Sequence, residues 1–259
     1  MIITIFGSCR QDSLYEYFIV TKIKNSLTFP HYSKEILQAI QFCTGECVPP
    51  EAFTRRIFRS GILKGRNMDY KRYINDFKNT DLFVVEIASR ISYEYKGYYA
   101  HHILSEDEFA PPDRDSIIIR DLTDFEIEED LKAIKRLLYP KKLMVVSHFY
   151  TRNHGKRYEL AMLLKKLTEK HEIPFFDPVY EAREYNPDDL FEKERVQTHL
   201  SKFGHKILGK KYYDFIKKLI PNCLFYKSIK NPVPKERFQL LWIITKNAKI
   251  SKIYYYKVI

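Results

Sequence analysis

Short apolar runs rich in β-branched residues alternate along this chain with longer amphipathic segments. The apolar runs predict strands, and the clearest of them span 2–6, 82–87, 143–148 and 174–176. The segments between and after them repeat apolar residues at helical spacing and span 69–77, 124–138, 156–171 and 201–219. Thr123 and Glu126 have the spacing of a capping box before the second of these segments. Near-continuous apolar strands separated by helices predict an α/β fold with a mostly parallel sheet covered by helices on both faces.

The composition supports a folded domain. The chain has 259 residues, of which 45% are apolar and 30% charged, and this balance excludes collagen-like and disordered classes. No apolar stretch is long enough to cross a bilayer, so we expect no membrane span. Pro221 follows the last helical segment, and strand-like runs at 238–245 and 250–259 come after it. We therefore expect an α/β domain over 1–220 and a basic, Tyr-rich β appendage over 221–259.

The positive charge is concentrated at one end of the chain. The formal net charge is +11, of which residues 215–259 contribute +9 and the preceding 214 residues +2. Any contact with a polyanion is therefore expected through 215–259. The alternative is that lysines on edge strands there only prevent aggregation.

Four cysteines do not make a disulfide framework in a chain of this length. The beginning of the sequence has neither a basic leader nor an apolar run of signal-peptide length, so we expect a cytoplasmic protein. Cys43 and Cys47 are separated by three residues, and no second Cys/His pair stands near them. We therefore expect no metal.

The first predicted strand leads directly into Gly7-Ser8-Cys9-Arg10, after which a helical pattern begins. In parallel sheets ligands bind at the carboxyl ends of the strands, where the first turn of a helix offers free N–H groups. A thiol beside an arginine in that place is a candidate nucleophile. Alternatively, Gly7 allows a tight turn and Cys9 is a small buried residue.

This series of motifs resembles the SGNH (GDSL-like) hydrolase superfamily, whose first block is Gly-Asp-Ser after the first strand. Here Gly7-Ser8-Cys9 stands in that place with cysteine as the nucleophile. The variant is similar to the branch that contains the capsule-polysaccharide acetyltransferase WcbI and to the GSCFA group. The chain is also similar to uncharacterised proteins of large DNA viruses. The resemblance covers about 1–220 and implies a five-stranded, mostly parallel sheet and acyl-transfer chemistry.

The resemblance also implies an oxyanion hole. Its second block supplies a glycine before a helix and the third strand, which corresponds to Gly61. Its third block is Gly-x-Asn-Asp, but the chain has Glu86-Ile87-Ala88-Ser89-Arg90 in that place. Ser89 or Arg90 would then replace the asparagine donor, and a cationic Arg90 can stabilise an oxyanion or bind a phosphate or carboxylate.

The last block of the family carries Asp-x-x-His before the final helix, and His199 corresponds to its histidine. Val196 stands where the aspartate is usual. The site would then act as a Cys9–His199 dyad, or a carboxylate elsewhere would orient the imidazole; the candidates are Asp189, Glu192 and Glu194. The alternative for His199 is a surface histidine that caps the helix.

A basic stretch surrounds the second block and consists of Arg55, Arg56, Arg59, Lys64 and Arg66. It is either a solvated face or a site for the phosphates of acetyl-CoA or another acyl-CoA donor, to which Ser8, Arg10 and His148 would also contribute. His101-His102 and 148–154 follow predicted strands and are either ordinary loop residues or substrate contacts. The tyrosine-rich stretch at 93–99 is interpreted as a packed or sugar-facing loop.

These observations lead to two functional hypotheses. The first is an SGNH-like O-acyltransferase or esterase acting on carbohydrate, with Cys9 as nucleophile, His199 as base, and the Cys9 and Gly61 N–H groups holding the oxyanion. The second is a non-catalytic protein of the same fold that binds RNA or a protein partner through its basic C-terminal segment. The missing aspartate and asparagine motivate the second, since a decayed site would lack them.

Overall fold

The computed structural model describes residues 1–20, 27–64, 70–150, 152–192 and 199–221. Its centre is a five-stranded parallel sheet in the order β2-β1-β3-β7-β8. These strands are Ile19–Val20, Ile2–Phe6, Leu82–Ile87, Lys142–Ser147 and Phe175–Phe176 in that order. The predicted fold class is therefore confirmed.

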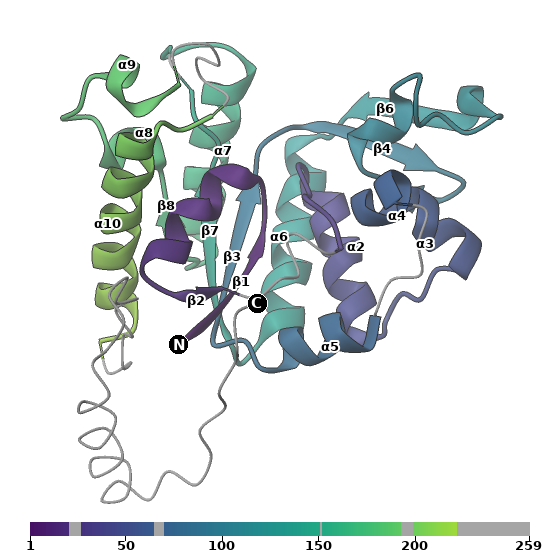
Figure 1. Ribbon diagram of the computed structural model, residues 1–259, viewed down its shortest axis with the longest axis horizontal. Coiled ribbons are helices and arrows are strands. Elements are labelled where there is room, and N and C mark those ends of the chain that lie inside the picture. The colour runs from purple at the N-terminus through teal and green to yellow at the C-terminus, as the bar shows by residue number, and fades with distance from the viewer. Residues whose placement is uncertain (21–26, 65–69, 151, 193–198, 222–259) are drawn as a thin grey trace, which may run out of the picture. The chain divides into compact units, whose positions relative to one another are not determined.

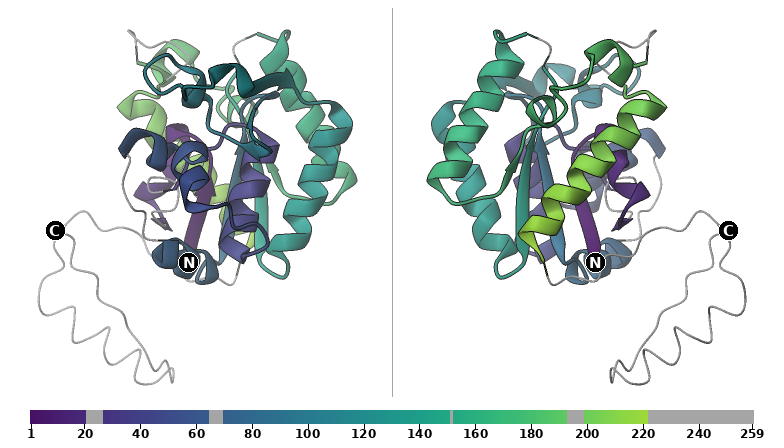
Figure 2. Two further views of the ribbon diagram at one scale, coloured as in Figure 1. Left: turned by 90° about the vertical axis from the view of Figure 1, so that its right-hand side faces the viewer. Right: turned by 90° about the vertical axis from the view of Figure 1, so that its left-hand side faces the viewer.

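Helices cover both faces of this sheet (Figure 1). One face carries α2, α5, α6 and α7, which are Ser33–Thr44, Tyr70–Lys78, Asp124–Leu138 and Lys156–Lys170. The other carries a 3-10 helix, η1, and the last helix, α10, which are Cys9–Glu16 and Lys202–Leu219. Figure 2 shows α10 crossing this second face.

Alternation along the strands explains the two layers of core. Ile3 and Ile5 point to the α10 side, whereas Phe6 belongs to the cluster on the α2 side. In β3, Val84 packs on the α10 side and Val85 on the α2 side. All six residues of this strand are buried. A strand that is apolar on both faces is typical of the middle of a parallel sheet.

The predicted helices are present within a residue or two of their expected limits. The Thr123 hydroxyl accepts a hydrogen bond from the Glu126 N–H, and the Glu126 carboxylate accepts one from the Thr123 N–H, which confirms the capping box of α6. Helix α2 was not predicted from the sequence. Neither were the short helices α3, α4, α8 and α9 and two 3-10 turns, η2 and η3; these span Glu51–Ile57, Arg59–Lys64, Pro178–Glu181, Pro187–Leu190, His102–Ser105 and Arg114–Ser116.

The tyrosine-rich stretch forms a hairpin in a small antiparallel sheet of order β5-β4-β6. These strands are Tyr98–Tyr99, Ile91–Tyr95 and Ile117–Asp121. Lys96 and Gly97 both have positive φ, 51° and 82°, as a two-residue turn of this kind requires. Tyr95 is fully buried, so the stretch is packed as expected but is strand rather than loop.

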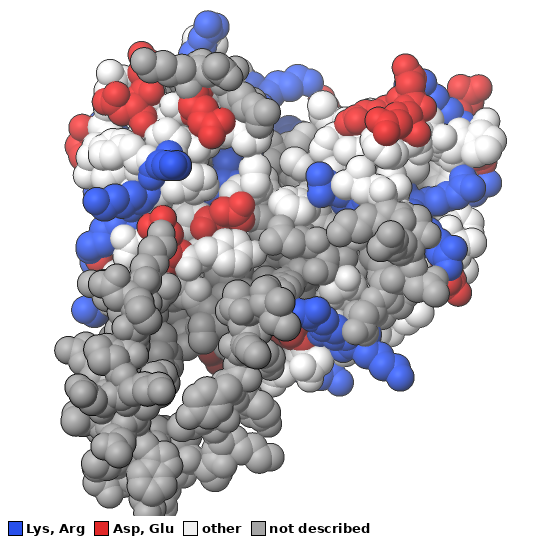
Figure 3. All heavy atoms as spheres, in the orientation of Figure 1, with Lys and Arg blue, Asp and Glu red and all other residues white. Residues whose placement is uncertain are grey.

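Charged side chains of both signs are mixed on the face shown in Figure 3, in keeping with the small net charge expected for this domain. None of the helices in the described part of the chain is both long and apolar enough to cross a membrane. The predicted β appendage lies outside the described residues apart from Pro221. Its structure and the boundary near residue 220 stay predictions.

Candidate active site

Three neighbouring strands place polar side chains at the same edge of the sheet. Gly7-Ser8-Cys9 follows β1, Glu86 is the penultimate residue of β3, and His148 follows β7. Because β1, β3 and β7 are adjacent and parallel, their carboxyl ends meet. This is the edge at which open α/β sheets bind their ligands.

Glu86 is the centre of a buried hydrogen-bond network at this edge. Its Oε2 accepts hydrogen bonds from the Ser8 N–H and hydroxyl, both at 2.6 Å. Its Oε1 lies 3.0 Å from Nδ1 of His148. Ser8, Glu86 and His148 are all buried. The network therefore ties the loop after β1 to the ends of β3 and β7.

Gly7 is required by the position of Glu86. A Cβ atom on Gly7 would lie 2.7 Å from Cβ of Glu86 and 2.9 Å from its Oε2. Both contacts are shorter than side chains tolerate, so any larger residue would displace Glu86 or the loop. The glycine of the motif therefore allows the carboxylate to reach Ser8.

The charges of this network are balanced internally. Burial alone would raise the pKa of Glu86, but the hydrogen bond and charge of His148, the charge of Arg10 and the Ser8 hydroxyl together lower it below its usual value. Burial lowers the pKa of His148, against the effect of Glu86. Glu86 is therefore ionised at neutral pH and accepts a hydrogen bond from the Nδ1–H group of His148.

Arg10 completes the network from the other side of Ser8. It is buried, and its Nη1 lies 3.4 Å from the Ser8 hydroxyl. Burial lowers the pKa of Arg10, while Glu86 and Cys9 act in the opposite direction. Ser8 also caps η1, because its hydroxyl accepts a hydrogen bond from the Arg10 N–H at 3.4 Å. Ser8 thus holds the first turn of η1 in place.

Cys9 is the first residue of η1 and is a partly exposed free thiol. Its place immediately after Ser8 puts it next to the buried network and at the carboxyl edge of the sheet. Cys9 lies at a helix start, where the sequence placed it, and it is partly exposed rather than buried; its role as nucleophile stays a prediction.

His199 lies just before α10, which begins at the same edge of the sheet as η1 (Figure 1). It is half-buried, and its carbonyl accepts a hydrogen bond from the Glu192 N–H at 3.0 Å. The helix cap is Ser201, whose hydroxyl accepts from the Gly204 N–H, so His199 is not the capping residue. Among the acidic residues predicted to orient His199, Asp189 accepts a hydrogen bond from the Ser201 hydroxyl at its backbone carbonyl. Glu194 lies outside the described residues.

Two candidate oxyanion residues have structural contacts of their own. The guanidinium of Arg90 donates to Asp124 at 2.5 Å and to the Leu122 carbonyl at 3.4 Å. The Ser89 hydroxyl accepts from the Ile91 N–H at 2.9 Å. These contacts hold the segment between the large and small sheets.

Gly61 lies within α4 rather than in a loop. A Cβ atom there would lie 2.6 Å from Cα of Arg55, so the glycine allows α4 to pack against α3. Arg55 and Gly61 also line a cavity of about 310 Å³ together with Arg56, Leu104 and Phe109. Arg55 pairs with Glu51 at 2.5 Å, and Arg59 stacks on the Phe29 ring at 4.7 Å.

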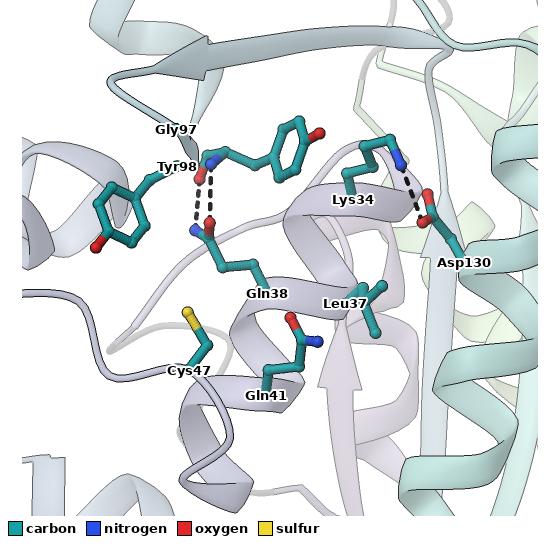
Figure 4. Close-up of a pocket in the computed structure, with 9 residues that line it drawn as sticks. Lys34, Leu37, Gln38, Gln41, Cys47, Gly97, Tyr98 and Asp130 are labelled. Carbon is teal, nitrogen blue, oxygen red and sulfur yellow. Dashed lines mark hydrogen bonds and ion pairs between the residues drawn. The ribbon is translucent and has the colours of Figure 1, made fainter.

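A second cavity, of about 190 Å³, lies between α2 and β5 (Figure 4). Gln38 exchanges two hydrogen bonds with the Tyr99 backbone, at 2.7 and 2.8 Å, and Lys34 pairs with Asp130 at 3.3 Å. Cys47 also lines this cavity, and burial raises the pKa of its thiol. Cys47 is thus a half-buried cysteine whose thiolate form is disfavoured.

Sequence reasoning did not single out Glu86 as a functional residue, although its signal was present. An acidic residue in the otherwise apolar run 82–87 must be buried, and a buried charge requires partners. The partners themselves cannot be read from the sequence, because Ser8 and His148 are 78 and 62 residues away.

Comparisons with known proteins add a partial family match. Residues 1–116 match the family model described as the TviD N-terminal domain. This span contains Ser8, Cys9 and Glu86 but ends before His148 and His199. No curated protein sequence matches the chain.

Among solved structures, the chain is similar to a lipase/acylhydrolase from Enterococcus faecalis, with 13% identity and a TM-score of 0.40 over 88% of this chain and 98% of that one. A protein described as an acylhydrolase from Bacteroides fragilis matches with 11% identity and a TM-score of 0.42 over 85% and 87%. An aryl esterase from M. smegmatis matches with 12% identity and a TM-score of 0.33 over 84% and 99%.

Proposed function

We propose that this protein is an acyl-transfer enzyme in which Cys9 is the nucleophile. The observation that carries the proposal is the partly exposed thiol at the first turn of η1, next to a buried Ser8–Glu86–His148 network at the carboxyl edge of the sheet. A nucleophile needs access to substrate and a fixed position; the partial exposure of Cys9 and the hydrogen bonds of Ser8 support the proposal on these two counts.

The proposed reaction has two steps. The Cys9 thiolate attacks the acyl carbonyl, a thioester forms, and the leaving group departs with a proton from His199. An acceptor hydroxyl then loses its proton to His199 and attacks the thioester, which releases the thiolate. Water in place of the hydroxyl would make the protein an esterase. The N–H groups of Cys9 and Gly61 are the proposed oxyanion donors.

The proposed role of Glu86 and His148 is to position the nucleophile. Glu86 fixes both polar groups of Ser8, and the backbone of Cys9 is bonded directly to Ser8. Since the hydroxyl of Ser8 donates to Glu86, Ser8 itself is held as a structural residue. This explains why a serine precedes the cysteine and why the buried carboxylate stays charged.

The proposed substrates are an acyl-CoA donor, such as acetyl-CoA, and a carbohydrate acceptor. The cavity of about 310 Å³ supports the donor, because it combines Arg55 and Arg56 with apolar Leu104 and Phe109. Guanidinium groups bind phosphates, and an apolar lining suits the pantetheine chain. The acceptor is inferred from the resemblance of the motifs alone.

The test is detection of an acyl adduct by intact-mass measurement after incubation with acetyl-CoA or an activated ester. We expect one acetyl group on Cys9 of the unmodified protein and none on Cys9→Ser. The matched control is Cys47→Ser, which removes a half-buried thiol whose burial raises its pKa and should leave the adduct unchanged. His199→Ala should slow formation of the adduct about 10²–10⁴-fold, the usual contribution of a general base. Adduct formation that is unchanged in Cys9→Ser would contradict the proposal.

The alternative is a non-catalytic binding protein that engages RNA or a protein partner through its basic C-terminal segment. The concentration of +9 of the net charge in residues 215–259 favours it. An acyl adduct on Cys9 would count against a decayed site. Acyl transfer at Cys9 and binding through residues 215–259 can be tested separately, because they are assigned to different parts of the chain.

A further inference from the structure

Three histidines gather beside the candidate active site. His31 precedes α2, whereas His101 and His102 lie at the start of η2. One ring nitrogen of each lies within 4.8 Å of those of the other two, and no other such group of metal-ligating side chains occurs among the described residues. The ring centroids are 4.3–5.3 Å apart. Residues about 70 positions apart in sequence therefore converge on one point.

The backbone on both sides of this cluster is anchored. The His31 carbonyl accepts hydrogen bonds from the Ala88 and Ser89 N–H groups, at 2.8 and 2.9 Å. The His101 N–H donates to the Ile57 carbonyl at 2.9 Å. The cluster is thus built onto the end of β3 and onto α3, which fixes the distance between its two segments. Such preorganisation reduces the cost of binding a ligand.

Burial disfavours the charged form of all three imidazoles. Burial, followed by the charge of His102, lowers the pKa of His31 to about 3. Burial is also the largest cause of the lowered pKa values of His101 and His102. The neutral form that burial favours is the form in which an imidazole binds a metal ion.

One atom of the cluster is buried without a hydrogen bond of normal geometry. This atom is Nε2 of His101. The Phe29 carbonyl lies near the ring and raises its pKa. The other nitrogen, Nδ1, accepts a weak hydrogen bond from the Ile103 N–H at 3.3 Å. Because Nδ1 accepts, the proton of the neutral ring is on Nε2, so binding a metal ion through Nε2 requires the ring to change tautomer and to give up its weak contact with Ile103.

We propose that His31, His101 and His102 bind one divalent transition-metal ion of the zinc class. Three imidazoles are a donor set that zinc uses, with a fourth position left open. Metal–nitrogen distances of about 2.0–2.1 Å require small rotations of the three side chains from their present separation. His102 is half-exposed, and this gives the ion a path from solvent.

The surrounding charges partly favour a cation. Oε1 of Glu106 lies 3.9 Å from Nε2 of His102, and the charge of Glu86 acts on His31. Arg59 opposes them, since it lowers the pKa values of His101 and His102. Arg10 also acts on His31, so the two carboxylates are matched by two guanidinium groups and these four charges sum to zero.

The test uses Co²⁺ and Zn²⁺ alone as probes on the full-length protein. We expect one Co²⁺ per chain, the visible absorption of a low-coordinate cobalt site, and displacement of Co²⁺ by Zn²⁺. His102→Ala should weaken binding by more than about tenfold, because even outer-shell partners of metal ligands contribute 10–100-fold. His154→Ala, which removes an exposed histidine of the loop after β7, is the matched control and should bind as the unmodified protein does.

A Cys9→Ser variant separates this site from the candidate nucleophile. Retained binding in Cys9→Ser together with loss in His102→Ala supports the histidine site. Loss in Cys9→Ser with full binding in His102→Ala overturns it, because the ion would then be held by the thiolate. Absence of stoichiometric binding to the unmodified protein also overturns it. The outcome is independent of the acyl adduct, which is measured on Cys9 by mass.

Discussion

At the scale of single residues, Glu86 decides the character of the candidate site. It is one of a few acidic side chains that are almost fully buried, and it stands in a strand whose other residues are apolar. Removing an ionised carboxylate from water is costly unless hydrogen bonds replace the lost hydration. Ser8 supplies two of these bonds and His148 faces the other oxygen. The residue is therefore stable as an anion only while the three strand ends meet.

We predict that Glu86→Gln destabilises the protein by about 2–3 kcal/mol at pH 7, since hydrogen bonds to charged groups are worth about 1.5–3 kcal/mol. The pKa of Glu86 is lower in the folded state, so its contribution is present above the ordinary glutamate pKa and decreases as pH falls below about 4.5. The stability difference between the unmodified protein and the variant should therefore shrink between pH 5 and pH 3.

Urea unfolding at a series of pH values measures this difference. Glu159→Gln, an exposed substitution on α7, is the control and should change stability by less than about 0.5 kcal/mol. A difference for Glu86→Gln that stays constant from pH 5 to pH 3 would mean that the carboxylate is not stabilised in the folded state.

At the scale of elements, the packing of α10 on η1 determines where Cys9 lies. Gly209 of α10 faces the backbone carbonyl of Ser13, and a Cβ atom there would lie 2.7 Å from that oxygen. The Ser13 hydroxyl lies 3.0 Å from Nδ1 of His205, one turn earlier on the same helix. The tyrosine ring of Tyr212 stacks on Phe176 with centroids 4.0 Å apart, which fixes α10 against β8. The helix that follows His199 is thus attached to the helix that begins with Cys9.

We predict that Gly209→Ala lowers stability by up to about 2 kcal/mol, because overpacking costs about 1–3 kcal/mol and the higher helix propensity of alanine returns about 1. The displaced α10 should also slow the formation of the acyl adduct on Cys9. Thermal unfolding and the intact-mass assay measure the two effects. Lys206→Ala, an exposed position on the same helix, should alter neither. Stabilisation by Gly209→Ala would show that the two helices are free to separate.

At the scale of the whole molecule, charge divides the chain into two regions of different character. The first 214 residues carry +2 and the last 45 carry +9. In the described part of the chain, cations pair with nearby acids, as in the Lys170–Glu128 pair at 2.6 Å and the Arg120–Glu126 pair at 2.6 Å. Exposed pairs of this kind contribute little to stability but leave little excess charge for a polyanion.

We predict that the combined substitution Lys246→Gln, Lys249→Gln and Lys252→Gln weakens binding to single-stranded RNA and lowers its salt dependence. Each lost phosphate contact should reduce the slope of log K against log salt by about 0.7. The control replaces three exposed lysines of the α/β domain, Lys165, Lys166 and Lys206, by glutamine. Fluorescence anisotropy at several salt concentrations measures both. Equal weakening by the control would refute the assignment of polyanion binding to the C-terminal segment.

The sequence predicted most of the secondary structure in the α/β domain. The long helices α6, α7 and α10 and the strands β1, β3 and β7 have apolar residues at regular spacing, and this spacing is a local property. The strand β2 and the antiparallel sheet were not predicted. Their residues pair with partners elsewhere in the chain, for example Ile2 with Ile19 and Tyr93 with Ile119, and a short strand has no periodicity of its own.

The candidate site was likewise predicted only in part from the sequence. Cys9 and its place after a strand could be identified from the sequence, because a glycine, a short loop and a helix start are adjacent positions. The network around Glu86 and the cluster of His31, His101 and His102 could not, because their members lie on segments separated by 60 residues or more. Their positions follow from the strand order β2-β1-β3-β7-β8, from the packing of η2 against α4 and β4, and from the hydrogen bonds that join His31 to the segment after β3. The sequence by itself determined the α/β class and the candidate nucleophile, and only the tertiary structure decided which buried charges and imidazoles surround it, because such groups become neighbours only when the strand ends meet.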